Sequence, residues 1–186
     1  MHTRIAIATL IGLLAADISA AQERIPWDPN CSPVHGALRA TWSAERFSAM
    51  IYEVRPDGTL RPHMEARFTD SAVFERSLGS ERNRWIASRR EGWSAWDRFG
   101  PKYSGCKLAT KDGGNTGSGR RYTAKWYGFP YKADAELWLS PDAKIVSKLL
   151  RRYSGTRWEF PFPNALLVFN LDPASALEPP GIAPPD

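Results

Sequence analysis

The residues whose types and spacing come closest to a catalytic pair are the carboxylates of segment 134–142. Asp134 and Glu136 are two residues apart, so on a β-strand they would point to the same face, and Asp142 follows them. Paired carboxylates can act as acid and base in glycoside hydrolysis. Nearby basic side chains offer a plainer interpretation, pairing with the acids across strands: Lys132, Lys144, Lys148, Arg151 and Arg152. We therefore expect structural or surface carboxylates and predict no catalytic residue.

The other patterns for catalysis, metal binding or phosphate binding are incomplete. His63 stands between charged residues in an alternating run, which predicts a solvated surface histidine, and His35 lies in a predicted helix. The sequence has neither a G-x-S-x-G motif nor the haem-attachment motif CxxCH. The glycine-rich stretch 113–119 lacks phosphate-loop spacing and precedes an aromatic, β-branched run, so it is interpreted as a loop. No metal or cofactor is predicted.

Aromatic residues suggest a binding surface. The sequence has 8 tryptophans, and 12% of its residues are aromatic. Tryptophan combines a large apolar area with one hydrogen-bond donor, which suits an apolar groove. Packing within the core is the alternative for each of them. The predicted ligand-binding residues are Trp85, Trp93, Trp96, Trp126 and Trp138.

The N-terminal residues indicate export. Arg4, an apolar run and the small residues Ser19 and Ala21 are typical of a signal peptide over 1–21. We therefore expect a periplasmic or secreted protein that does not span the membrane after processing. The net charge of +5 favours anionic lipids or acidic glycans as partners over nucleic acid in that compartment, and a generic solvated basic surface is the plainer interpretation.

The sequence contains 2 cysteines, Cys31 and Cys106, and an oxidising compartment predicts that they form a disulfide. A bridge closing so long a loop would stabilise the fold by roughly 4 kcal/mol in the chain-entropy model.

The body reads as one antiparallel-sheet domain over 22–171. Ser32 and Pro33 begin a short helix that need not continue past Ser43. Alternating runs on both sides of Pro56-Asp57-Gly58 predict a hairpin, with Pro62 at an edge or facing outward.

Further strands are expected along the rest of the chain. Their segments are 71–80, a run to about residue 90, 120–127, 133–139 and 144–153. The aromatic stretch that ends at 100–101 is expected to be irregular. Segment 156–170, broken by prolines, is expected to cross an end of the sheet or to add a last short element. The proline-rich tail 172–186 is expected to be disordered.

Segment 135–153 reads as a hairpin with Pro141 and Asp142 in its turn. If the loop closes at Leu139 and Lys144, Trp138 lies opposite Ile145, and Glu136 lies opposite Ser147. Trp138 then belongs to a sheet surface.

This order of elements, with WSAERFSAMIYEVR early and ELWLSPDAKIVSKLLRRY late, resembles the periplasmic lipoprotein carrier (LolA/LolB-like) superfamily from about Pro33 to Asn170. The chain departs from the lipoprotein member in having no lipid-attachment cysteine after the leader. The resemblance implies a mainly β (α+β) fold: a curved antiparallel sheet or half-barrel with a short N-terminal helix, helical or irregular cover and an apolar concave face. It carries no motif that assigns individual residues.

Three functional hypotheses follow. The first is a non-enzymatic protein that binds a lipid, acyl chain or other amphipathic envelope ligand on the concave face. The second is an envelope scaffold with a filled core that contacts another envelope protein. The third is a hydrolase using Asp134 or Glu136.

Overall fold

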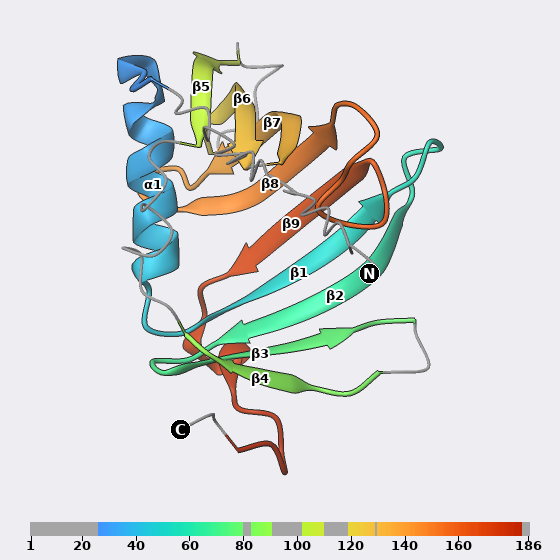
Figure 1. Cartoon of the computed structure of the whole chain (residues 1–186). Helices are drawn as coiled ribbons and strands as arrows, with labels where there is room; N and C mark the ends of the chain where they lie inside the picture. The colour runs from blue at the N-terminus through green and yellow to red at the C-terminus, as the bar shows by residue number, and fades with distance from the viewer. Residues whose placement is uncertain (1–25, 80–82, 91–101, 110–118, 129, 184–186) are drawn as a thin grey trace, which may run out of the picture.

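The computed structural model describes residues 26–79, 83–90, 102–109, 119–128 and 130–183. These residues form a mainly β fold with one α-helix and a nine-stranded antiparallel sheet, in the order β4-β3-β2-β1-β9-β8-β7-β6-β5. The sheet is not closed, because β4 and β5 are its two edges (Figure 1). The strands are β1 (Phe47–Val54), β2 (Leu60–Phe68), β3 (Ala72–Ser77), β4 (Ile86–Arg89), β5 (Tyr103–Leu108), β6 (Arg121–Gly128), β7 (Tyr131–Leu139), β8 (Val146–Tyr153) and β9 (Asn164–Asn170).

The predicted helix is confirmed as α1 (Ser32–Ser43), with proline in its first turn. It buries one side, with Val34 and Leu38 packed in the core. Thr41 joins the helix to the sheet: its buried hydroxyl donates to the Ala37 carbonyl at 2.9 Å and accepts the Val146 amide at 2.9 Å. This polar contact fixes α1 against the start of β8.

The hairpin of β1 and β2 is also confirmed. Gly58 has a φ of 81°, which glycine adopts without steric cost, and the Asp57 carboxylate accepts the Thr59 amide at 2.9 Å. Pro62 lies in the part of β2 beyond its register with β3, which begins at Met64. The missing N–H of Pro62 therefore interrupts no β2–β3 hydrogen bond.

The last strand is central. Segment 156–170 adds a last short element, as one alternative expected, whereas the other alternative, a crossing at an end of the sheet, is wrong. β9 pairs with both β1 and β8, so it joins the two halves of the sheet. Its buried side chains are Ala165, Leu167 and Phe169. The alternate side chains Leu166 and Val168 are half-buried, so both faces of β9 are at least partly covered, which fits its nearly continuous apolar sequence.

The β7–β8 hairpin is confirmed, but its predicted register is wrong. Trp138 lies opposite Lys148, and Glu136 lies opposite Leu150. The turn continues to Ile145, whose carbonyl accepts the Ser140 amide, and Ala143 takes a φ of 59°. An irregularity between Trp138 and Leu139 then shifts the pairing.

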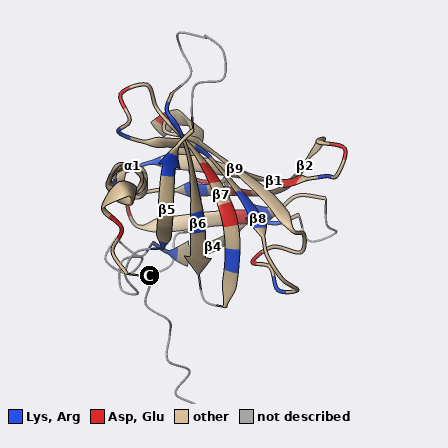
Figure 2. Cartoon of the chain, turned by 90° about the horizontal axis from the view of Figure 1, so that it is seen from above, with Lys and Arg blue, Asp and Glu red and all other residues tan. Residues whose placement is uncertain are grey.

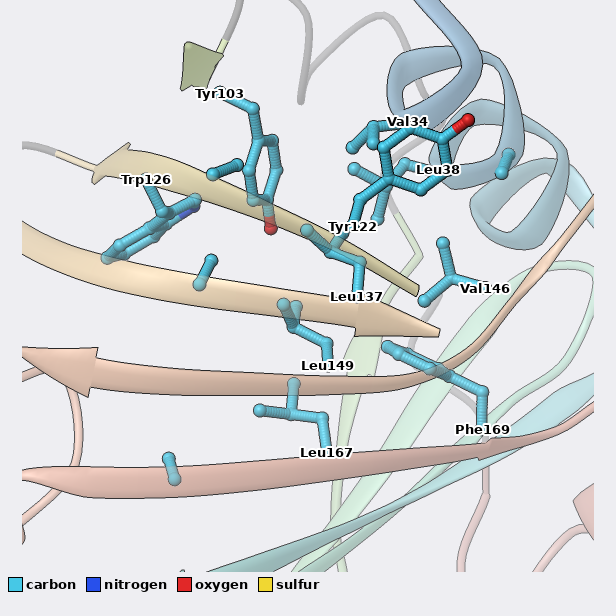
Figure 3. Close-up of a cluster of buried hydrophobic side chains, with 14 of the residues drawn as sticks. Val34, Leu38, Tyr103, Tyr122, Trp126, Leu137, Val146, Leu149, Leu167 and Phe169 are labelled. Carbon is cyan, nitrogen blue, oxygen red and sulfur yellow. The ribbon is translucent and has the colours of Figure 1, made fainter. Parts of the chain in front are cut away.

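The two faces of the sheet differ in cover. We call the face that packs against α1 the inner face and the opposite one the outer face. In Figure 3 the inner face carries a row of apolar side chains beneath α1, including Leu137, Leu149 and Leu167. These residues belong to one buried cluster that also includes Val34 and Leu38 of the helix. The core therefore lies between α1 and the inner face.

The chain after β9 packs against the sheet, so the prediction of a disordered tail is wrong for 172–183. Asp172 caps a 3₁₀ helix, η2 (Pro173–Ala176), through its carboxylate. Ala176 is completely buried, and Ser175 forms a 2.9 Å hydrogen bond with Ser48 of β1. The prolines of this segment stiffen it for packing instead of keeping it unfolded.

The predicted disulfide is confirmed. Cys31 and Cys106 are bonded, with their Cα atoms 5.0 Å apart. Cys31 ends η1 (Pro29–Cys31), immediately before α1, while Cys106 lies in edge strand β5. The bond therefore ties the start of α1 to one edge of the sheet.

Candidate ligand cavity on the inner face

A cavity of about 370 Å³ lies between α1 and the inner face. Its walls come from both halves of the sheet, including Ile51 and Ala66 on one side and Leu149 and Leu167 on the other. Leu38 and Trp42 of α1 contribute a further wall. A small, mostly apolar cavity with a few polar groups is the usual form of a ligand site.

A buried arginine provides the main polar group of this cavity. Arg151 of β8 is only 5% exposed and shares the inner face with Leu149 and Tyr153. Its Nη1 donates to Glu159, in the β8–β9 connection, and Tyr153 donates to the same carboxylate oxygen at 2.7 Å. Burial acts to lower the pKa of Arg151, but the neighbouring Tyr103 and Glu159 outweigh it and raise that pKa. Arg151 therefore remains a cation inside the cavity.

Trp126 of β6 stacks against this arginine. The guanidinium carbon of Arg151 lies 3.9 Å from the Trp126 ring centroid, a cation–π contact. Room for the indole depends on Gly128, where a Cβ would come within 2.5 Å of the ring. Tyr103 of β5 is the cross-strand partner of Trp126, and Figure 3 shows both side chains on the inner face.

A second arginine marks another part of the cavity wall, beside the end of α1. Arg90 donates to four carbonyl oxygens, at 2.6 to 2.8 Å, from Glu45, Thr69, Trp42 and Ala44. Three of these carbonyls, those of Trp42, Ala44 and Glu45, lie in the last turn of α1 or directly after it, where a cation also suits the helix dipole. Arg90 thus connects α1, the β2–β3 turn and the end of β4.

The predicted tryptophans do not form one surface. Trp126 is buried in the cavity wall. Trp85 instead lies beside Arg67 and Arg76, whose guanidinium carbons are 4.6 and 4.7 Å from its ring centroid. Trp138 is half-buried on the outer face, because its neighbours Leu137 and Leu139 point inward. Trp93 and Trp96 lie outside the described residues, as does most of the glycine-rich stretch.

The acidic pair of β7 lies on the outer face, away from the cavity. Asp134 pairs with Lys125, and Glu136 pairs with Arg152 and lies 3.8 Å from Arg121. Figure 2 shows these opposite charges side by side on β6, β7 and β8. The expectation of cross-strand ion pairs is confirmed for Glu136 with the anticipated Arg152, whereas Asp134 pairs with Lys125, which was not anticipated. The anticipated partner Arg151 points inward to Glu159.

His63 is half-buried beside aromatic rings, so the prediction of a solvated surface histidine holds only in part. An irregularity in the β1–β2 register beside it, between Ile51 and Tyr52, alters the simple alternation. Its ring meets Phe162 edge-on at 4.9 Å and Phe160 at 6.2 Å. Burial lowers its pKa; the charge of Glu53 raises it, and Arg61 lowers it further.

This environment predicts a pH effect on stability. The folded protein lowers the pKa of His63 below its ordinary value of about 6.5, so the unfolded chain binds its proton more readily. Stability from the neutral imidazole is present above that value and is lost as pH falls through it towards the folded pKa. We expect wild type to lose more stability than His63→Gln between pH 7 and pH 5, measured by urea denaturation. Equal losses in the two proteins would contradict this prediction.

No group of three or more His, Cys, Asp or Glu side chains in the described ranges is arranged to hold a metal ion. Within the same ranges, no helix has both the length and the apolar character needed to cross a bilayer. No protein-family model matches the chain, and comparison with curated proteins gives no match. Fold and site therefore define a class only: an open antiparallel-sheet protein with a largely apolar inner-face cavity that contains a buried arginine.

Proposed function

We propose that this is an exported binding protein that holds an apolar or amphipathic ligand, a lipid or acyl chain, on the concave inner face of a half-barrel sheet. We also propose that the chain resembles the periplasmic lipoprotein carrier superfamily in its fold. The cavity between α1 and the sheet is the single observation that carries it.

The lining of the cavity supports an amphipathic ligand. Its apolar walls suit a hydrocarbon chain, whose transfer from water is favourable in proportion to the area buried. The charged side chains of the lining are four cations and two carboxylates: Arg89, Arg90, Lys102, Arg151, Glu75 and Glu159. This excess of positive charge favours a ligand with an anionic head group.

The disulfide and the leader sequence support the location. A disulfide persists in oxidising compartments such as the periplasm or the cell exterior, and this chain has one between Cys31 and Cys106. Residues 1–21 have the composition of a signal peptide. A periplasmic or secreted protein accounts for both observations.

The same observations weigh against the two other hypotheses. An envelope scaffold with a filled core would leave no ligand-sized space, whereas about 370 Å³ is available here. A hydrolase using Asp134 or Glu136 would need them at a cleft, but both form ion pairs on the outer face. Ligand binding on the inner face is therefore the hypothesis that we carry forward.

Mass spectrometry of lipids extracted from the natively exported protein tests the proposal. We expect a co-purifying amphiphile, and we expect the delipidated protein to bind the uncharged dye Nile red at about one site. Protein that carries no amphiphile and binds neither Nile red nor alkyl compounds would overturn the proposal.

Filling the cavity should abolish binding. Ala66 is 3% exposed and lines the cavity, so Ala66→Phe would place an aromatic ring in the space available to the ligand. We expect Nile red affinity to fall at least about tenfold, the loss that follows when a few buried methylene contacts disappear. Fluorescence titration measures it.

A matched control adds the same ring outside the cavity. Thr123 of β6 is exposed on the outer face, so Thr123→Phe should leave Nile red affinity unchanged. Equal affinities in the two variants would place the dye elsewhere than in the cavity.

A further inference from the structure

Two buried hydrogen-bond donors in the cavity wall lack acceptors. Among the residues that the structure describes, neither the Nε of Arg151 nor the Nε1 of Trp126 has a hydrogen-bond partner. Both side chains are about 95% buried, at 5% exposure each. Guanidinium and indole nitrogens only donate hydrogen bonds. Each of these two nitrogens therefore needs an acceptor. Leaving such donors unsatisfied is costly, more so for a charged group.

The two donors belong to one patch. The Arg151 guanidinium stacks over the Trp126 ring at 3.9 Å, and both residues line the cavity. Glu159 accepts from Nη1 of Arg151, and no hydrogen bond from Nε accompanies it among the described residues. An acceptor at Nε must therefore come from elsewhere.

The charge around this patch favours a monoanion. Lys102 also lines the cavity, and burial together with the charge of Arg151 lowers its pKa. Glu159 is a carboxylate that interacts with both of these cations. A second anion placed here would relieve the repulsion between Lys102 and Arg151.

The size of the cavity limits the rest of the ligand. Its volume of about 370 Å³ corresponds to roughly twelve molecules of liquid water at about 30 Å³ each. A methylene group occupies a similar space to a water molecule. One chain of roughly twelve carbons therefore fits, whereas two long chains do not.

We infer that the ligand is a single-chain carboxylate of about twelve carbons, whose head group accepts hydrogen bonds from Arg151 Nε and Trp126 Nε1 beside Lys102. Its chain lies along the apolar wall formed by residues such as Leu149 and Leu167. This inference rests on the proposed function, because it specifies the ligand of the same cavity.

Displacement of Nile red from the delipidated protein tests the head group. The competitors are dodecanoate, dodecanol and dodecylammonium at pH 8, all below their micelle-forming concentrations. Hydrogen bonds to a charged group make the carboxylate at least about tenfold tighter than the alcohol, and the ammonium compound weakest. Dodecyl phosphate serves as a fourth competitor, and tighter binding of this dianion than of dodecanoate would overturn the choice of a carboxylate.

The length of the ligand's alkyl chain gives an independent test of the size of the cavity. From octanoate to dodecanoate, four further methylene groups become buried, and affinity rises on the order of a hundredfold. From dodecanoate to hexadecanoate we expect no further gain, because the cavity is full. Affinity that continues to rise through hexadecanoate would contradict the inferred size.

Substitutions test the two donors. Trp126→Phe keeps an aromatic ring and removes the indole N–H, and Arg151→Lys keeps the charge and removes Nε. In both variants we expect the preference for dodecanoate over dodecanol to fall at least about fivefold, the loss of one charge-assisted hydrogen bond. The matched control is Trp138→Phe on the outer face, where the preference stays as in wild type. A merely destabilised cavity would weaken both compounds and leave their ratio unchanged, which would overturn the assignment of the donors.

The outcomes separate this inference from the proposed function. If dodecanol binds as tightly as dodecanoate, the cavity is an apolar site without an anion subsite, and only the inference fails. If Nile red and every alkyl compound fail to bind, the proposed function fails with it.

Discussion

Replacing both Cys31 and Cys106 with serine is expected to lower the free energy of unfolding by about 4 kcal/mol. The bond closes a loop spanning 75 positions, and opening it restores the conformational freedom of that loop in the unfolded chain. The loop contains α1 and β1–β4, so nearly half of the sheet lies inside it. Urea denaturation of the double variant against the oxidised wild type measures the change.

Reduced wild type is the control for side-chain effects of serine. Both cysteines are buried, at 0% and 6% exposure, so part of any loss in the serine variant comes from placing hydroxyl groups in the core. Reduced wild type should lose nearly as much stability as the serine variant. A loss below about 1 kcal/mol in both would mean that the unfolded chain keeps the two segments together without the bond.

Local patterns in the sequence were sufficient to predict the helix and the hairpins. Pro33 at the start of α1 and the glycine of Pro56-Asp57-Gly58 act within a few residues of their own position. Such signals depend on backbone preferences that the sequence states directly. The two cysteines, being the only possible pair, likewise left one bridge to predict.

The position of β9 in the sheet could not be predicted from local sequence patterns. Asn164–Asn170 inserts between β1 and β8, and the residues that pair with it are far from it in sequence on one side. Prolines at 161 and 163 suggested an interruption, although they end just where the strand begins. The continuous apolar run that follows was the available sign of a strand with both faces covered at least in part.

The residues that line the site depend on the register of the strands. This explains why some predicted site residues lie at the cavity and others do not. A shift of one residue exchanges the faces of a strand. Trp138 lies on the outer face because it alternates with the inward-facing Leu137 and Leu139. Arg151 was overlooked because it resembled a surface partner for the β7 acids. A signal was present, since Arg151 alternates in phase with the apolar Leu149 and Tyr153 while Arg152 is out of phase.

Removing Glu159 should destabilise the protein far more than removing a similar carboxylate on the other face. Glu159 is the ion-pair partner of Arg151, whose side chain is only 6% exposed. With Glu159→Ala the arginine would be a buried charge without its counter-ion, and Tyr153 would lose its acceptor. Breaking a buried pair from one side costs about 3 kcal/mol or more, and urea denaturation at pH 7 measures the loss.

Asp134 on the outer face supplies the control. It pairs with Lys125, and the side chains of Asp134 and Lys125 are 59% and 74% exposed, so this ion pair is worth about 1 kcal/mol at most. Asp134→Ala should therefore cost little, although both variants remove one carboxylate from a neighbouring cation. Similar losses in Glu159→Ala and Asp134→Ala would contradict the assignment of a buried charge to the cavity.

A double substitution separates the cost of an isolated charge from that of lost packing. Arg151→Met with Glu159→Leu removes both charges and keeps apolar volume, and such exchanges of a buried pair are often close to neutral. We expect the double variant to recover most of the stability lost in Glu159→Ala. The same double variant should also lose its preference for dodecanoate over dodecanol, because the cation that recognises the carboxylate is gone. Recovery of stability with loss of that preference would show that Arg151 is kept in the cavity for its ligand and not for the fold.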